Sequence, residues 1–474
     1  MKKGAVSILL SLGFFLSLQA QDSLSLTLGR VLALVQDNHP VAKQASLLPE
    51  EAGAYLLKAR GSFDPKLQFQ QSNKYYNGSN YYEIKETGLK IPTWFGLELA
   101  AGWESAKGSS LNPEDKTPAE GLSYAGASLP LLRNLITDQR RTQLKQAKLM
   151  REGGNYAKNV VLNELAAEVI ETYLQWYTAW REVKLYEQGL QLSQTRLQAI
   201  VSEFQAGGRA AVDTIETALQ VQNFAVALKE SRWYELKWRL MLSAHLWNGR
   251  GEPLEPEDNT IPAASGLDAL DSLVAAFPDS VVISNLAEQH PEVVLRELGL
   301  QSLQLDYRLQ RQNLLPDIQL KYQSLSNGWF NHASTPGMMY DNYRFGLHMG
   351  SSLFLRKERG EYKLSRLKLQ GTTFKFGQKN RELTQKIKSQ WQQERTLGSV
   401  YSSYDGIVSG YEALYNMEIQ RFQAGDGTLF LLNTREQRLV ESRQKQIGYY
   451  RKWKQSQSDY LQQSGVLWNL ISRP

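Results

Sequence analysis

Residues 162–208 read LNELAAEVIETYLQWYTAWREVKLYEQGLQLSQTRLQAIVSEFQAGG, and this stretch decides how the chain folds. Steps of four and three residues from Leu162 to Phe204 visit 13 positions, of which eleven are apolar. A repeat of 3.5 residues lines one side of a helix with apolar side chains and predicts a supercoil with a partner helix. No proline occurs from Asp138 to Phe204, so we expect one helix there, about 100 Å long.

The same plan is written twice along the chain. Gly207-Gly208 ends the first long helix, and residues 212–247 resume a helical pattern in the return direction. In the second half, residues 357–422 and 429–470 form the corresponding pair of helical stretches, again separated by a glycine-containing turn. The tetrapeptide Phe-Gln-Ala-Gly stands before both turns, and His-Pro opens both halves at 39–40 and 290–291. These matches in one order indicate an internal duplication with one long helical hairpin in each half.

Strand-like segments lie between the helices. Residues alternate between apolar and polar in 67–71, 97–103, 122–132, 318–325 and 343–349. Alternating runs of about ten residues are typical of transmembrane barrel strands, although a water-soluble sheet gives the same pattern. Aromatic residues gather near the ends of these runs, as at a membrane interface: Tyr75, Tyr76, Tyr81, Tyr82, Trp94, Trp329, Phe330, Tyr340 and Tyr343.

Composition and the N-terminus narrow the class of protein. The 474 residues include no cysteine and five scattered histidines, with 54 basic and 48 acidic side chains. No nucleophile elbow, zinc-protease motif or phosphate loop is present, so the sequence does not indicate an enzyme, a metal site or a cofactor. Lys2 and Lys3 precede an apolar stretch from Ala5 to Leu18, which predicts a signal peptide cleaved after Ala20 and an exported protein of net charge +4. Nucleic acid is therefore an implausible partner.

The ordered set of features resembles one family. The residues that carry the resemblance are the N-terminal Leu24-Ser-Leu-Thr-Leu28 with Asn38-His39-Pro40, the Leu129-Pro-Leu-Leu-Arg133 strand exit, and the two Phe-Gln-Ala-Gly turns. With the C-terminal stretch 449–465 they resemble the TolC-like outer membrane efflux proteins (outer membrane factors) over essentially the whole mature chain. The resemblance implies an α+β membrane protein with two internal repeats per chain.

The resemblance also implies an assembly and a function. Three chains would pool their strands in one outer-membrane β-barrel of a Gram-negative bacterium, and their helices would continue it as a coiled-coil tunnel across the periplasm. Such a homotrimer acts as a passive exit duct in tripartite efflux or type I secretion, with a periplasmic adaptor (membrane fusion) protein and an inner-membrane pump. The alternative is an exported coiled-coil structural or adhesive protein with no channel.

The chain departs from the family between Tyr76 and Leu122. The family has two strands in each half, whereas residues 84–90 and 95–107 add the pattern of a further hairpin around Pro92-Thr93. This insertion, residues 77–121, either widens the barrel from about four strands per chain to about six or forms a flap. We expect a flap outside the standard barrel.

The periplasmic entrance of the family is locked by polar contacts at the hairpin turns, which also dock the adaptor. Asp213 matches an aspartate of that lock, but Gly427 replaces its arginine partner and Phe422 its tyrosine. Leu431 and Thr434 stand at the acidic-ring positions. A contact between Arg209 and Asp426 could replace the lock, unless both are solvated turn charges. The candidate entrance and docking residues are therefore Phe204, Gly207, Arg209, Asp213, Phe422, Gly425 and Asp426.

A basic cluster follows the last strand of each half, at Arg133 and at Arg356, Lys357 and Arg359. Cations at a helix N-terminus oppose the helix dipole, so we expect an anionic partner to compensate them. Phospholipid headgroups of the inner leaflet suit that role, and a solvated helix face is the alternative.

These patterns divide the chain as follows: 1–20 signal peptide, 21–65 N-terminal periplasmic helical segment, 66–132 first β segment with the extra hairpin, 133–248 first long helical hairpin, 249–280 linker, 281–315 helix opening the second repeat, 316–355 second β segment, and 356–474 second long helical hairpin and C-terminus.

Overall fold

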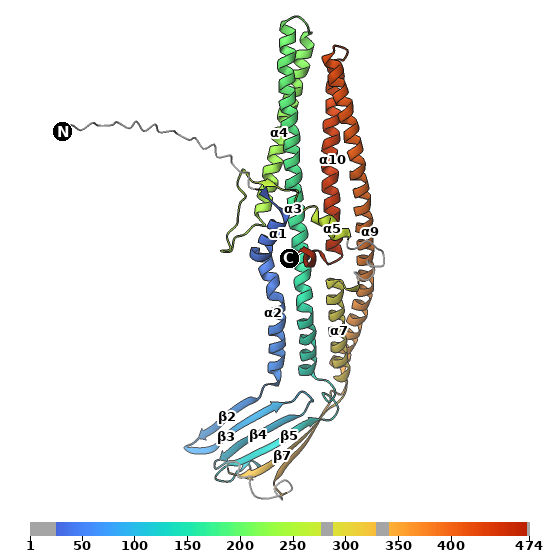
Figure 1. Ribbon diagram of the computed structural model, residues 1–474. Coiled ribbons are helices and arrows are strands. Elements are labelled where there is room, and N and C mark those ends of the chain that lie inside the picture. Colours follow the sequence, from blue (N-terminus) through green and yellow to red (C-terminus); the bar gives the residue numbers. More distant parts are fainter. Residues whose placement is uncertain (1–24, 276–287, 329–340, 472–474) are drawn as a thin grey trace, which may run out of the picture. The chain divides into compact units, whose positions relative to one another are not determined.

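The computed structural model describes residues 25–275, 288–328 and 341–471 (Figure 1). The expected signal peptide and the aromatic residues Trp329, Phe330 and Tyr340 lie outside this part. Contacts divide the chain into two units, which we describe separately. The hairpin unit contains Met1–His39, Glu168–Leu273 and Arg395–Ser458, and the sheet unit contains Pro40–Ala167, Val274–Glu394 and Asp459–Pro474.

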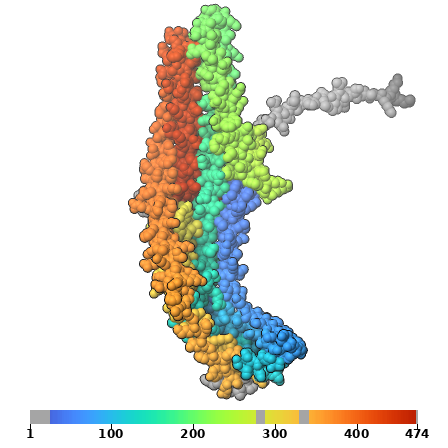
Figure 2. All heavy atoms as spheres, turned by 180° about the vertical axis from the view of Figure 1, so that it is seen from behind, coloured from blue at the N-terminus to red at the C-terminus, as the bar shows by residue number. Residues whose placement is uncertain are grey.

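Four long helices confirm the two predicted helical hairpins. Helices α3 (Gln139–Gln205) and α9 (Arg356–Gln423) have 67 and 68 residues, and each contributes to both units. Helix α4 (Ala211–Ser243) returns beside α3, and α10 (Leu429–Gln463) returns beside α9 (Figure 2). No helix among the described residues combines the length and the apolar character needed to cross a membrane.

The burial of the apolar seam changes along α3. Val169, Tyr173 and Trp176 have no exposed surface, so the middle of the seam is fully buried. Towards the end of the helix the seam opens, and Phe204 is 42 % exposed. At the other end, the Asp138 carboxylate accepts a hydrogen bond from the backbone N–H of Arg141 at 2.7 Å and caps the helix.

The sheet unit contains one antiparallel sheet in the order β2-β3-β4-β5-β7-β8. The strands are β2 (Lys66–Tyr76), β3 (Ser79–Pro92), β4 (Glu98–Lys107), β5 (Leu122–Pro130), β7 (Asp317–Asn327) and β8 (Tyr343–Gly350). The expected flap is therefore wrong, because the inserted residues form β3 and β4 inside the sheet. Each of these strands has backbone partners on both sides, which an independent flap would lack.

The two faces of this sheet differ in chemistry, and the strand register shows it. On one face, the apolar face, the row Ile91–Leu99–Ala127–Tyr322–Phe345 crosses five neighbouring strands. On the other, the polar face, the row Lys66–Lys90–Ala100–Gly126–Gln323–Arg344 crosses all six. The apolar face remains open in one chain, since Leu347 is 62 % exposed.

Side chains on the polar face lie across neighbouring strands. Tyr124 is buried over Gly88 and Gly102, where an added Cβ would approach its hydroxyl oxygen to 2.5 and 2.6 Å. Its hydroxyl donates to Glu86 at 3.1 Å. Arg344 on β8 pairs with Glu104 on β4, three strands away, or about 14 Å across a flat sheet at the usual strand spacing. The sheet must curl towards the polar face for this ion pair to form.

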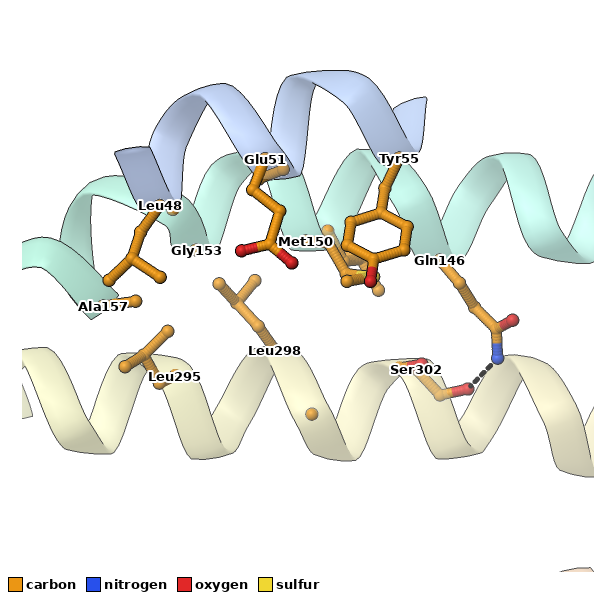
Figure 3. Close-up of a pocket in the computed structure, with 14 residues that line it drawn as sticks. Leu48, Glu51, Tyr55, Gln146, Met150, Gly153, Ala157, Leu295, Leu298 and Ser302 are labelled. Atoms are coloured by element: carbon orange, nitrogen blue, oxygen red, sulfur yellow. Dashed lines mark hydrogen bonds between the residues drawn. The ribbon is translucent and has the colours of Figure 1, made fainter. Parts of the chain in front are cut away.

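Helices α2 (Pro40–Arg60) and α7 (Pro291–Gln312) pack on α3 in the sheet unit and leave an apolar cavity of about 360 Å³ between them (Figure 3). Gln146 donates to the Ser302 carbonyl at 3.1 Å at one side of the cavity. Gly154 permits the close approach of α2, because a Cβ at this position would lie 3.0 Å from the Pro49 Cα.

The linker is more ordered than its proline content indicates. Strand β6 (Ile261–Pro262) pairs in parallel with β1 (Ser25–Leu26), and helix α5 (Ala269–Ala275) follows. Asp271 on α5 accepts hydrogen bonds at 2.7 Å from Lys454, which is 1 % exposed, and from Gln457. In the sheet unit, the C-terminal helix α11 (Leu467–Ile471) is held by a hydrogen bond from the backbone N–H of Trp468 to the side-chain oxygen of Asn163. The contact between Asp271 and the buried Lys454 thus joins the linker to α10.

Two histidines stack in the hairpin unit where α1 (Leu28–Asn38) ends. The His39 and His245 rings lie 5.9 Å apart, and Trp247 meets His39 edge-on. Burial lowers the pKa of both imidazoles, and His245 lowers that of His39 further, although the Glu168 carboxylate opposes the shift in each. Folding therefore favours neutral imidazoles.

We expect the Gly154→Val variant to unfold more readily by about 1–3 kcal/mol, because the larger side chain must push α2 away from α3. Thermal or denaturant unfolding of the purified protein measures this. The control is Gly299→Ala on α7, where no atom lies within 4 Å of the added Cβ, and its stability should stay equal or rise. Equal losses in both variants would contradict the packing role of Gly154.

We also expect the unfolding temperature to fall as the pH drops below about 6.5. The pKa of both buried histidines is lowered in the folded protein, so below this pH the unfolded chain binds more protons than the folded one and is favoured. The double variant His39→Gln with His245→Gln should show a flatter profile of unfolding temperature against pH. The exposed His348→Gln serves as the control and should keep the slope of the original chain.

Candidate functional site

The two hairpin turns have the same backbone geometry. Gly207 follows α3 with φ of +78°, and Gly425 follows α9 with φ of +84°. In each turn, the residue after this glycine donates its N–H to a carbonyl five residues earlier, Gly208 to Glu203 and Asp426 to Arg421. This bond pattern ends a helix and reverses the chain, and the left-handed residue it needs is usually glycine. The repeated Phe-Gln-Ala-Gly is thus explained by the turn itself.

The two phenylalanines of the repeat are not equivalent. Phe422 is half-buried and packs on a core of Val408, Tyr415, Leu432 and Leu439 between α9 and α10. Phe204 is exposed, so only the Phe422 ring is half-buried against a hairpin. An exposed ring at the turn leaves apolar surface available to another molecule.

Within one chain, the partners of Arg209 are Glu203 and Phe422 rather than the Asp426 side chain. The Arg209 Nε donates to the Glu203 carboxylate at 2.7 Å, and its guanidinium lies 4.4 Å from the centre of the Phe422 ring. A carboxylate of its own hairpin and an aromatic face of the other hairpin thus interact with the cation. Arg209 therefore joins the two hairpins, but through an aromatic ring.

The two candidate aspartates lie close to the turns. Asp213 occupies the first turn of α4, where a carboxylate interacts favourably with the helix dipole. Its backbone carbonyl accepts a hydrogen bond from the buried Thr217 hydroxyl at 2.8 Å. Asp426 is exposed within the second turn.

A buried polar network near the turns joins all four long helices, and sequence reasoning missed it. Arg196 on α3 makes two bonds to Glu436 on α10, at 2.7 and 3.0 Å. Arg196 also donates to the Tyr415 hydroxyl on α9 at 2.9 Å. Asn433 on α10 accepts from Arg196 and donates to Glu216 on α4, at 3.1 and 3.0 Å. We call these five residues the four-helix network.

The electrostatics of this network depend on its burial. Glu436 is only 5 % exposed, so its charge needs the bidentate contact with Arg196. Burial opposes ionisation of Arg196, but the bonds from Glu436 outweigh that cost and raise the pKa of the guanidinium. Burial, together with the Glu436 charge, raises the pKa of Tyr415 to about 12. The charged pair and the neutral phenol are thus stable together.

A cleft of about 820 Å³ lies between the hairpins beside this network, where α3 and α9 approach each other near their ends. Leu192, Thr195, Arg209 and Phe422 contribute to its walls. Figure 2 shows the ends of the two hairpins next to each other at this place. The network and the Arg209–Phe422 contact therefore hold the hairpins together on either side of an opening.

The basic cluster is partly compensated within the chain. The Arg356 guanidinium lies 5.1 Å from the Phe354 ring centre, and Glu358 supplies a carboxylate in the first turn of α9. At the start of α3, Asp138 pairs with Arg141 at 3.3 Å. Acidic residues of the chain thus supply part of the compensation that we expected from lipid, while Lys357 and Arg359 remain exposed and Arg133 is half-buried.

Part of the chain matches a known protein family. Residues 282–463 match the family model described as outer membrane efflux protein. This match lies in the second repeat. No curated protein sequence matches the chain.

Solved structures share the fold over nearly the whole chain. CusC, whose structures concern transmembrane channel formation, has a TM-score of 0.66 at 13 % identity, covering 92 % of this chain and 91 % of that one. The open state of the Neisseria gonorrhoeae MtrE outer membrane channel has 0.65 at 13 %, covering 92 % and 88 %. The Campylobacter jejuni CmeC outer membrane channel has 0.64 at 13 %, covering 93 % and 86 %. The second repeat thus matches the family that the sequence resembles, and the solved outer membrane channels share the fold of the chain.

We expect Arg196→Met to lower the free energy of unfolding by about 3–5 kcal/mol, because Glu436 is then left buried without its partner. The double variant Arg196→Met with Glu436→Leu should recover much of this loss, since no unpaired charge remains. Denaturant unfolding measures both. The control Arg438→Met removes an exposed ion pair with Glu441 and should cost less than about 1 kcal/mol. Equal effects of Arg196→Met and Arg438→Met would show that the network has no structural role.

Proposed function

We propose that three copies of this chain form an outer membrane channel, the exit duct of a tripartite efflux or type I secretion system. The observation that carries the proposal is the fold, shared with outer membrane channels over about nine-tenths of the chain. The match of residues 282–463 to the efflux family supports it independently of the structure. Transport would be passive, from a periplasmic tunnel to the exterior of a Gram-negative bacterium.

The sheet supports the membrane part of this proposal. Towards the strand ends that join the helices, one face carries rows of apolar side chains, and Lys85, Glu83 and Lys107 follow further along this face. The other face carries mainly charged and polar side chains, as in strands that separate lipid from a water-filled lumen. A single chain cannot close a barrel with six strands, and lipid does not tolerate open strand edges. Chains that pool their strands satisfy both requirements.

The long helices support the periplasmic part. Each hairpin joins a helix of 67 or 68 residues to a return helix of 33 or 35 residues. Two paired helices have little core of their own, so each hairpin gains from packing against copies of itself. The turns would lie at the periplasmic entrance, where an adaptor protein and, through it, an inner-membrane pump would engage the duct. The exposed Phe204 and the Arg209–Phe422 contact are the docking surface we propose for the adaptor.

The direct test is reconstitution of the purified protein in planar bilayers. We expect trimers that are stable in mild detergent, with low conductance while the entrance is closed. Deleting the gene should sensitise the host to at least one class of exported compound. A protein that stays monomeric and water-soluble after gentle extraction would contradict the proposal.

We expect Asp213→Ala to raise the conductance of the reconstituted channel several-fold, because the carboxylate at the start of α4 is lost from the proposed entrance. Single-channel recording measures this. Glu441→Ala, which also removes one carboxylate but lies further along α10, is the matched control and should leave conductance unchanged. An unchanged closed-state leak in Asp213→Ala would remove Asp213 from the gate.

A further inference from the structure

We propose that the inserted hairpin β3–β4 is part of the barrel wall, so that three copies close a barrel of 18 strands. This inference rests on the proposed function, because it assumes that three chains pool their strands. Relatives with the simplest pattern have four strands per chain, so three copies of them would close a barrel of twelve strands. Barrel diameter grows roughly linearly with strand number, so the exit would be about 1.5 times as wide.

The backbone pairing is the first argument. Strand β3 pairs with β2 over its length, and β4 continues the ladder to β5. Among the described residues, β2 has no register with β5 and joins the sheet only through β3. If the hairpin left the wall, β2 would leave with it or would have to form a new ladder with β5.

The side-chain alternation is the second argument. On β3 and β4, Ile91 and Leu99 continue the apolar row of β5, β7 and β8, while Lys90 and Ala100 continue the polar row. The inserted strands have 14 and 10 residues, and after the apolar rows the same face carries Lys85, Glu83 and Lys107, which would lie at the water side of the membrane. A flap in water would not need an apolar row in register with its neighbours.

The contacts on the polar face are the third argument. Tyr124 of β5 fits over Gly88 of β3 and Gly102 of β4, and its hydroxyl donates to Glu86 of β3. Arg344, from the second repeat, pairs with Glu104 of β4. The inserted strands are therefore bound by side chains to both halves of the sheet and share its curvature.

The free edges complete the argument. Within the described residues, β2 and β8 each have a backbone partner on one side only. The occupant that fits both edges is a second copy of this chain, since β2 of one copy can pair with β8 of the next and repeat around a ring. Three copies of six strands give an even number, 18, as antiparallel closure requires.

The absence of cysteine makes the test simple, because an introduced thiol is the only one in the chain. Four single variants are reconstituted as trimers in liposomes: Leu99→Cys and Ala100→Cys on β4, and Leu347→Cys and His348→Cys on β8. Each pair places one thiol on the apolar face and one on the polar face. We expect a water-soluble maleimide to label Ala100→Cys and His348→Cys, and to label the other two more slowly by a factor of about ten or more, because lipid suppresses the reactive thiolate.

The two strands distinguish the possible failures. If β8 alternates but Leu99→Cys and Ala100→Cys are both labelled rapidly, the hairpin lies outside the wall, and the inference fails while the channel stands. If β8 does not alternate either, the sheet is not a membrane wall, and the proposed function fails with it. Heat-modifiable migration of each variant checks that the trimer has formed.

Discussion

The long helices carry an apolar seam along their length. This seam must be buried against other helices, because a single turn of the chain is too short to cover it. In α3 this seam is fully buried at Val169, Tyr173 and Trp176. Towards the turn the seam of α3 opens at Phe204, and the ion pair between Arg196 and Glu436 adds a polar contact between the helices there. A buried ion pair is costly to desolvate but geometrically selective, so it fixes which helix faces meet.

The helical part of the fold could be predicted from the sequence because its signals are long. The 3.5-residue repeat, the two glycine turns and the duplicated tetrapeptide each extend or recur over many residues, and α3, α4, α9 and α10 lie where these patterns indicate. The strands of the insertion could also be located. Their membership of the sheet could not, because alternation defines the two faces of a strand and says nothing about its neighbours.

The candidate site was harder to predict for a related reason. The turn glycines can be recognised in the sequence by their residue type and position. The partners of Arg196, in contrast, lie 219 to 240 residues away in sequence. No local pattern marks Glu436 or Tyr415 as different from other residues of a charged helix. Arg209 had an obvious acidic candidate in the other turn, yet it pairs with Glu203, six residues away, because a charge satisfied locally loses less side-chain entropy.

The even number of strands before α3 has an evolutionary consequence. Four strands separate α2 from α3, and two separate α7 from α9, so each repeat leaves the sheet at the rim where it entered. Adding or deleting a hairpin preserves this parity, whereas a single added strand would send the following helix to the opposite rim of the sheet. Descendants of such a chain can therefore change their circumference in steps of two strands, without altering the helices that follow.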